Sequence, residues 1–348
     1  MADILDIFNQ DPFKAIALTE SVQRNPFNPT GLGTLNLFDP NPIRTTALAV
    51  EERTGKLVLI PLSERGAEGL QRTTEKRKLR YFDVPRLMHD DTIYASEIQG
   101  IREFNTESVL MQVAEEVARR LSGPTGILAS VEYTKEYLRL GAIQGLMLDP
   151  KDGSVLYNWF DEFQITQAAE TPFNLAAGVA NSLRPICNGI RRTMARKSQG
   201  AFIENQSKVY AFCGDVFYDQ FVNHPDVVRT FLSWSAAADL RNDAQGAAFD
   251  SFPFAGITWV NYRGSDDNSS IKVPDASVKF FPVGAPGIFR EAMAPGETVD
   301  WVNTPGKPVY VLPIFDTQRR MYWKMEGYAY PLMICTRPEV LLSGRAGA

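Results

Sequence analysis

The 348-residue sequence predicts an α+β fold, in which one long helix supports a body of mixed sheets. Apolar residues recur at helical spacing through residues 104–121. Short β-rich runs with Gly, Pro and Asp turns lie on both sides of that helix. Residues 21–45 instead carry four prolines and no regular pattern, so we expect an extended segment there.

The composition excludes several function classes. Hydrophobic residues are 44% and charged residues 22%, which is typical of a globular chain. The net charge of −5 argues against a cationic nucleic-acid binder. The 2 His and 3 Cys are widely spaced, so no zinc ribbon or redox motif is present, and we expect three reduced, buried thiols.

The sequence contains no recognisable secretory signal or membrane span, so we expect a protein without membrane attachment. The segment MADILDIFNQDPF has no basic residue ahead of an apolar run, so it does not read as a secretory signal. No stretch approaches the roughly 20 apolar residues that span a bilayer. We therefore expect a soluble protein made in a reducing compartment.

The first 80 residues predict contacts made outside a compact core. Residues 1–20 suggest a short helix, and 21–45 an extended segment whose apolar side chains drape over this chain or a neighbour. Residues 46–62 predict a hairpin with its turn at 51–56. Residues 63–80 hold six basic and three acidic side chains with little apolar content, so we expect a projecting charged loop.

The middle of the chain predicts a connector at 81–103 and then the long helix. Ser122, Gly123 and Pro124 interrupt that helix, and a second helical pattern runs to about Gly141. Residues 143–160 predict a hairpin around an Asp-Pro-Lys-Asp-Gly turn.

The later part predicts an alternation of strands and helices. Pro185 suits the first turn of a helix that ends near Ser198. We expect a buried strand at 209–213, two short helices of which the second opens at Pro225, one strand within 252–264, and two β runs around Glu326 and Gly327.

A search for catalytic chemistry finds nothing above background. His89, beside Asp90 and Asp91, reads as part of a solvated loop, and His224 reads as a helix start. A carboxylate hydrolase would need an enclosed acid pair, and Asp161 with Glu162 is the kind of pair that any acidic chain contains. We therefore expect no catalytic, metal-binding or cofactor-binding residues.

A basic segment without any acid occupies residues 184–197. Its cations can pair with acids elsewhere in the fold, with a neighbouring subunit, or with nucleic-acid phosphates. The residues concerned are Arg184, Arg191, Arg192, Arg196 and Lys197.

The order of these features resembles the major capsid proteins of lambda-like tailed phages, which have the Hong Kong 97 phage capsid fold. Three blocks carry the resemblance. They are the helical block from Glu103 to Gly153 with its LMLDPKDGSVLYNWF hairpin, the segment KVYAFCGDVFYDQFVNHPDVVRTF, and the C-terminal KMEGYAYPLMICTRPEVLL. Together they cover most of residues 95–345.

The resemblance implies a domain layout. Residues 1–45 would be an N-terminal arm and 46–82 an extended loop with β-hairpin character. Residues 83–160 and 311–348 would form a peripheral domain with a long spine helix. Residues 161–310 would form an axial domain with a mixed sheet and flanking helices.

The resemblance also implies a function. Such proteins are not enzymes, and they assemble as pentamers and hexamers into the icosahedral head shell around double-stranded DNA. The chain would be made in the host bacterial cytoplasm and end in the virion capsid. Expected partners are copies of itself, a portal, a scaffold and a decoration protein, with non-specific contact to packaged DNA and no membrane.

Two alternatives to the capsid interpretation stay open. One is another virion or surface-layer assembly protein, and the other is the carboxylate hydrolase. Under the capsid reading, the candidate inter-subunit contacts are Arg65, Arg72, Lys76, Arg77, Arg80, Phe27, Leu35 and Phe38.

Overall fold

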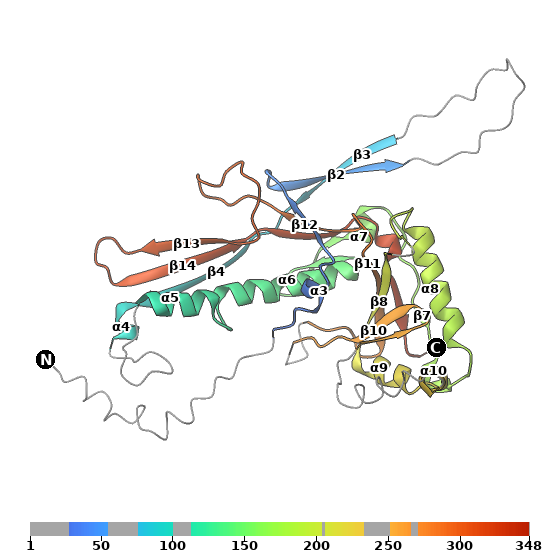
Figure 1. Ribbon diagram of the computed structural model, residues 1–348. Helices are drawn as coiled ribbons and strands as arrows, with labels where there is room; N and C mark the ends of the chain where they lie inside the picture. Colours follow the sequence, from blue (N-terminus) through green and yellow to red (C-terminus); the bar gives the residue numbers. More distant parts are fainter. Residues whose placement is uncertain are drawn as a thin grey trace, which may run out of the picture.

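The protein has an elongated half and a more compact half, joined along one long helical axis (Figure 1). The computed structural model describes residues 28–54, 76–99, 113–203, 206–232, 251–265 and 271–347. Helices and sheets are mixed along the chain, which confirms the expected α+β class.

A six-stranded mixed sheet organises the compact half. Its strand order is β7-β16-β11-β8-β10-β9, and the β8–β10 and β7–β16 pairs are parallel. The strands are β7 (Thr171–Pro172), β16 (Leu342–Arg345), β11 (Ser277–Val283), β8 (Lys208–Cys213), β10 (Ile257–Asn261) and β9 (Ser251–Phe254).

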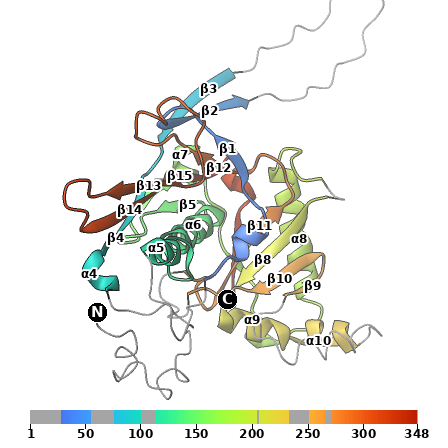
Figure 2. The same ribbon diagram turned by 60° about the vertical axis from the view of Figure 1, so that its left-hand side comes forward.

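Three helices accompany this sheet, as Figure 2 shows from a second side. They are α8 (Leu183–Lys197), α9 (Asp215–Val222) and α10 (Pro225–Leu232), with 3-10 turns η2 (Leu175–Ala177) and η3 (Pro338–Val340). The predicted helix from Pro185, the strand at 209–213 and the helix opening at Pro225 are all confirmed.

Stacked aromatic rings fill the core of the compact half. The Trp259 ring stacks on Phe221 with centroids 3.9 Å apart, and it meets Phe280 edge-on at 5.5 Å. Cys187, Cys213 and Cys335 are free and buried, as expected. Burial raises the pKa of the Cys187 and Cys335 thiols to about 12, so these groups stay protonated.

The elongated half is built on two consecutive helices, α5 (Val113–Ser122) and α6 (Ile127–Ile143). The break at 123–126 confirms the interruption expected from Gly123 and Pro124. A side chain at Gly126 would place its Cβ 2.7 Å from the Arg120 carbonyl oxygen, so the tight link between the helices requires glycine there.

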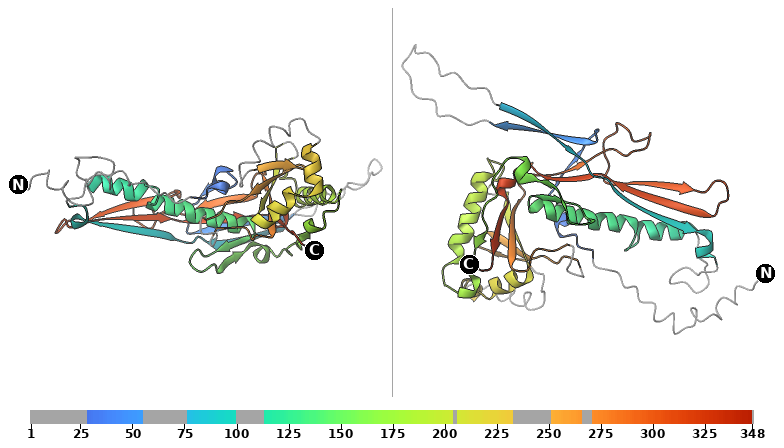
Figure 3. Two further views of the ribbon diagram at one scale, coloured as in Figure 1. Left: turned by 90° about the horizontal axis from the view of Figure 1, so that it is seen from below. Right: turned by 180° about the vertical axis from the view of Figure 1, so that it is seen from behind.

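A three-stranded antiparallel sheet lies along these helices (Figure 3). Its order is β13-β14-β4, from β13 (Tyr310–Phe315), β14 (Tyr322–Ala329) and β4 (Leu87–Tyr94), and the short helix α4 (Ala95–Ile98) follows β4. Ile93, Ile127 and Met325 form the buried contact between helix and sheet.

Two expectations for this sheet were wrong. Residues 81–103 are not a mere connector, because β4 lies within them, and His89, Asp90 and Asp91 are therefore strand residues and not a solvated loop. The Asp90 and Asp91 charges are balanced by Lys324 and Arg120, which local sequence could not reveal. The chain also does not turn at Glu326 and Gly327, since β14 runs straight through both.

A second three-stranded sheet ties the N-terminal segment to the body. Its order is β1-β12-β15, from β1 (Asp39–Pro42), β12 (Phe289–Met293) and β15 (Pro331–Cys335). The Ile43 N–H donates to the Met293 carbonyl at 2.9 Å, so the missing N–H groups of Pro40 and Pro42 fall on the open side of this edge strand. A short helix, α3 (Gly31–Thr34), precedes β1, so residues 21–45 are not wholly extended.

A two-stranded ribbon projects from the body (Figure 1). It pairs β2 (Ala47–Thr54) with β3 (Lys76–Asp83) in antiparallel register. The hairpin predicted within 46–62 was therefore wrong, because residues 51–54 continue β2 and its partner strand lies at 76–83. Of the projecting charged loop expected at 63–80, residues 76–80 lie in β3 of this ribbon, and 63–75 lie outside the described residues.

The remaining hairpins are local. β5 (Leu146–Leu148) pairs with β6 (Val155–Asn158), which confirms the hairpin expected at 143–160, and α7 (Trp159–Glu162) follows. The single strand expected in 252–264 is two strands, since Ala255 and Gly256 turn the chain with φ of 51° and 76°.

The sheets cross the expected domain boundaries. β16, from the C-terminal segment assigned to the peripheral domain, belongs to the six-stranded sheet, whereas β12, from the segment assigned to the axial domain, pairs with β1 and β15. The C-terminal segment therefore passes through both halves.

Substitution of two glycines by alanine should change the free energy of unfolding in opposite directions. A Cβ at Gly327 would overlap the Ile127 side chain on α6, whereas a Cβ at Gly189 in α8 meets nothing within 4 Å. We expect Gly327→Ala to lower the free energy of unfolding by about 1–3 kcal/mol. We expect Gly189→Ala to raise it by about 0.5–1 kcal/mol.

Urea unfolding of the unassembled subunit, followed by circular dichroism, measures both changes. Equal destabilisation by the two substitutions would contradict the proposed contact between β14 and α6.

Candidate functional site

The described residues contain no arrangement typical of a catalytic or metal centre. No group of three His, Cys, Asp or Glu side chains among them could hold a metal ion. Asp161 and Glu162 lie in α7, where Asp161 accepts a hydrogen bond from the Asn158 amide at 2.6 Å. His224 is buried and accepts from the Asp226 N–H at 3.2 Å, which fits a helix start.

Three structural anchors stand out instead, and the first is a buried carboxylate on α6. Glu136 is fully buried. Its oxygens accept the Leu32 N–H at 2.7 Å, the Gly33 N–H at 3.1 Å and the Tyr262 hydroxyl at 2.9 Å. The long helix, the N-terminal helix α3 and the segment after β10 therefore meet at one side chain.

Neighbouring charges extend this anchor into a network. Lys135 lies 3.3 Å from Glu291 on β12, and Arg139 lies 3.6 Å from Glu136 and 3.7 Å from Glu291. The network thus also joins α6 to the sheet that holds β1. The sequence signal was the spacing of Glu132, Lys135, Glu136 and Arg139, which places charges on one face of an otherwise apolar helix, and our sequence analysis missed it.

A second anchor fixes α5 to β4. Arg120 pairs with Glu116 at 2.6 Å, Asp91 at 3.0 Å and Glu97 at 2.8 Å. The neighbouring guanidinium of Arg119, helped by Arg120, lowers the pKa of Glu116 and keeps its carboxylate charged despite its burial.

The third anchor is the base of the ribbon. Phe82 is buried against Trp159, with ring centroids 5.3 Å apart, and the Asp83 N–H donates to the Tyr157 hydroxyl at 3.0 Å. Arg80 donates to the Glu162 carbonyl and lies over the Phe163 ring. The base is therefore fixed to the β5–β6 hairpin and α7.

Beyond this base, the opposite face of the ribbon exposes apolar side chains. Tyr81 is 68% exposed and Leu79 is 52% exposed, on the same side of β3. Exposed apolar groups on a projecting element commonly mark a contact with another molecule.

The expected inter-subunit residues are placed differently from one another. Arg80, Leu35 and Phe38 make contacts inside this chain, and Phe38 packs edge-on against Phe289 at 5.3 Å. That these three residues also contact a neighbour stays a prediction. Lys76 and Arg77 lie in β3, and Arg65, Arg72 and Phe27 lie outside the described residues.

The basic residues at 184–197 all lie on α8 and are exposed. None of the five forms an ion pair with a described acidic residue, and Arg184 approaches the Thr230 hydroxyl at 3.5 Å. Within the described chain, the structure thus does not bring acids to these cations.

The fold is that of the Hong Kong 97 class of phage capsid proteins. The capsid protein of cyanophage P-SCSP1u superposes with a TM-score of 0.56, at 10% identity over 94% of this chain and 91% of that one. At that identity the likeness establishes the fold alone.

The chain belongs to the phage major capsid protein E family, whose model matches residues 14–346. It is 24% identical to the major capsid protein of Pseudomonas phage KPP10, covering 97% of this chain and 98% of that one. It is also 24% identical to the major capsid protein of Salmonella phage Felix O1, covering 95% of each.

This membership confirms the expected class, a major capsid protein of tailed phages, and its function. The protein is a structural component of the phage virion that assembles with itself into a shell. Within the described residues, no helix combines the length and apolar character that crossing a membrane requires.

The Glu136 anchor predicts a large loss of stability on truncation. Glu136→Ala leaves two backbone N–H groups and the Tyr262 hydroxyl without their acceptor, so we expect a loss of about 3 kcal/mol or more. Glu132→Ala, one turn away at a half-exposed position, should cost less than about 1 kcal/mol. Hydrogen exchange at Leu32 and Gly33 should accelerate only in the Glu136 variant, and unchanged protection of both amides would refute the anchor.

The same carboxylate predicts a dependence of stability on pH. Burial raises the pKa of Glu136, although the donors from Leu32 and Tyr262 oppose this change. Its protonation therefore contributes stability that is present below the unfolded pKa of about 4.5 and is lost as pH rises through the folded pKa. Glu136→Gln cannot ionise, so the difference in unfolding free energy between the wild type and this variant should shrink as pH rises. A constant difference between pH 4 and 8 would contradict this assignment.

Proposed function

We propose that this chain builds the closed icosahedral head shell of a tailed bacteriophage, as pentamers and hexamers around double-stranded DNA. The observation that carries the proposal is the β2–β3 ribbon, whose base is buried in its own subunit while Tyr81 and Leu79 remain exposed. Such an element can reach a neighbouring subunit with a fixed direction.

Anchoring of the ribbon base supports this role on energetic grounds. A ribbon that is already ordered loses little conformational entropy when it binds a neighbour, so more of its contact energy appears as affinity. Many modest contacts of this kind add up to a stable shell, while each remains weak enough to dissociate when misplaced.

The domain roles are part of the same proposal. Residues 1–45 would act as the arm and 46–82 as the extended loop. Residues 83–160 with 311–348 would form the peripheral domain, and 161–310 the axial domain around the capsomer centre. β12 pairs with β15, and β16 pairs with β11, so each strand joins a sheet of the other proposed domain. This pairing suggests that the two domains share a core.

We propose no catalytic activity for this protein, because its established role is structural and no group of described residues supplies a reaction. A portal, a scaffold and a decoration protein are the partners proposed beyond copies of itself. Contacts with these partners would use surfaces other than the buried anchors.

Electron microscopy of the purified full chain, expressed with and without a co-expressed scaffold, tests the proposal. We expect closed shells with five-fold vertices. Rings or tubes alone would support a different assembly protein, and only single subunits under every condition would refute shell formation.

We expect substitution of the two exposed ribbon residues to impair assembly without unfolding the subunit. Burial of a Tyr and a Leu is worth about 2–3 kcal/mol or more, so Leu79→Ser with Tyr81→Ser should raise the concentration needed for assembly at least about tenfold. The midpoint of urea unfolding of the subunit should stay unchanged, since both side chains are exposed.

Leu79→Met with Tyr81→Phe is the matched control for the ribbon test, because it keeps the apolar surface. Light scattering against protein concentration compares the variants. Normal assembly of the double Ser variant would show that this face of the ribbon does not contact a neighbour.

A further inference from the structure

We infer that the outward face of α8 binds the phosphate backbone of double-stranded DNA without regard to base sequence. The inference rests on the proposed function in one respect, which is that the shell encloses DNA. It concerns a surface that the fold leaves exposed and that no buried anchor uses.

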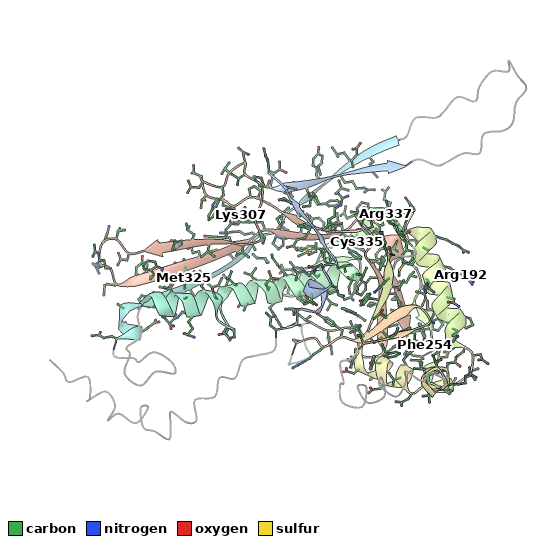
Figure 4. The ribbon with its side chains drawn as sticks, in the orientation of Figure 1. Arg192, Phe254, Lys307, Met325, Cys335 and Arg337 are labelled. Carbon is green, nitrogen blue, oxygen red and sulfur yellow. The ribbon has the colours of Figure 1, made fainter. Side chains whose placement is uncertain are left out.

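The helix places its apolar side chains on one side and two of its cations, Arg192 and Arg196, on the other. Leu183, Cys187, Ile190 and Met194 are buried toward the core, at spacings of three and four residues. Arg192 and Arg196 lie on the opposite side, one turn apart, and Figure 4 shows Arg192 pointing away from the body. Their position is thus dictated by the residues that the core requires.

The face is positively charged and has no acid of its own. The segment 171–203 contains no Asp or Glu, although the chain holds 41 acids in total. Arg192, Arg196 and Lys197 form no ion pair and no side-chain hydrogen bond with any described residue. The cations are therefore free to meet an external anion.

The face also lacks the apolar centre of a protein contact. The exposed positions of α8 are its five cations, Pro185 and Gly189. The exposed apolar residues nearest in the chain, Val179 and Ile203, lie outside the helix. Protein interfaces have a core that is depleted of charge, whereas nucleic-acid interfaces are polar and strongly positive, so these observations favour DNA.

The dimensions suit a duplex backbone. Arg192 and Arg196 are four residues apart, or about 6 Å along the helix on one face, and duplex DNA carries one charge per about 1.7 Å. Gly189 leaves open space on the exposed face, since a Cβ there would meet nothing within 4 Å. A phosphate can therefore approach this part of the helix without a bulky side chain in its way.

The expected binding is weak for one subunit. The net charge of −5 repels DNA elsewhere on the surface, so only this local face attracts it. Non-specific dissociation constants of about 10⁻⁴–10⁻⁶ M are usual at physiological salt. Weak contacts repeated over a shell would align the packaged DNA while still letting it move.

Fluorescence anisotropy with a labelled 30-base-pair duplex of random sequence tests the inference on the unassembled full chain. Arg192→Ala with Arg196→Ala should weaken binding by at least about tenfold at 50 mM NaCl. It should also reduce the slope of log affinity against log salt by about 2. Arg192→Lys with Arg196→Lys keeps both charges and should retain binding.

The matched control is Lys151→Ala with Lys307→Ala, which removes the same charge from exposed positions elsewhere. Equal effects of the two Ala pairs, or no effect of either, would overturn the inference. Loss of shell assembly with unchanged DNA affinity would also overturn it, because the face would then contact a neighbouring copy. Electron microscopy of the wild type in the same preparation judges the proposed function separately: a chain that binds DNA through α8 but never forms shells refutes shell formation alone.

Discussion

The buried carboxylate of Glu136 is the constraint on which the arrangement of the two halves depends. Removal of an ionised carboxylate from water costs several kcal/mol unless hydrogen bonds and opposite charge replace the lost hydration. Those replacements come from α3, from Tyr262 beyond the six-stranded sheet and from Arg139 on the same helix. The Glu136 side chain is therefore well accommodated only when all of these parts are assembled around it.

The other two anchors follow the same physical logic at the ends of the long helix. Arg120 holds α5 to β4 and α4 through Asp91 and Glu97, and Phe82 holds the ribbon to β6 and α7 through edge-on ring contacts. Each anchor fixes the direction of an extended element relative to the body. A subunit that must match its neighbours all around a shell needs those directions to be reproducible, and buried polar or aromatic contacts define direction better than apolar packing alone.

The exposed surfaces complement these anchors. The ribbon presents Leu79 and Tyr81, which suit contact with protein, and α8 presents cations without an apolar centre, which suit contact with phosphate. The two surfaces are formed by different elements, the β2–β3 ribbon and α8. Assembly and contact with DNA are therefore assigned to separate surfaces, so either one can be altered with the other left intact.

The sequence by itself determined the elements whose signal is local. The periodicity of α6, the Gly and Pro break before it, the turn at 149–153 and the helix opening at Pro225 all depend on residues close in the chain, and all are confirmed. The basic face of α8 could be predicted too, because apolar spacing fixes where its cations must point. The family could be anticipated from the order of these elements.

Only the tertiary structure decided which distant segments pair. β2 pairs along its whole length with β3, Lys324 and Arg120 offset the acids of β4, and β14 passes through Glu326 and Gly327. Phe38 is likewise a core residue of this chain, and the partly buried Leu35 packs against the same core. Strand pairing and buried charge depend on partners far along the chain, and a local pattern contains no information about them.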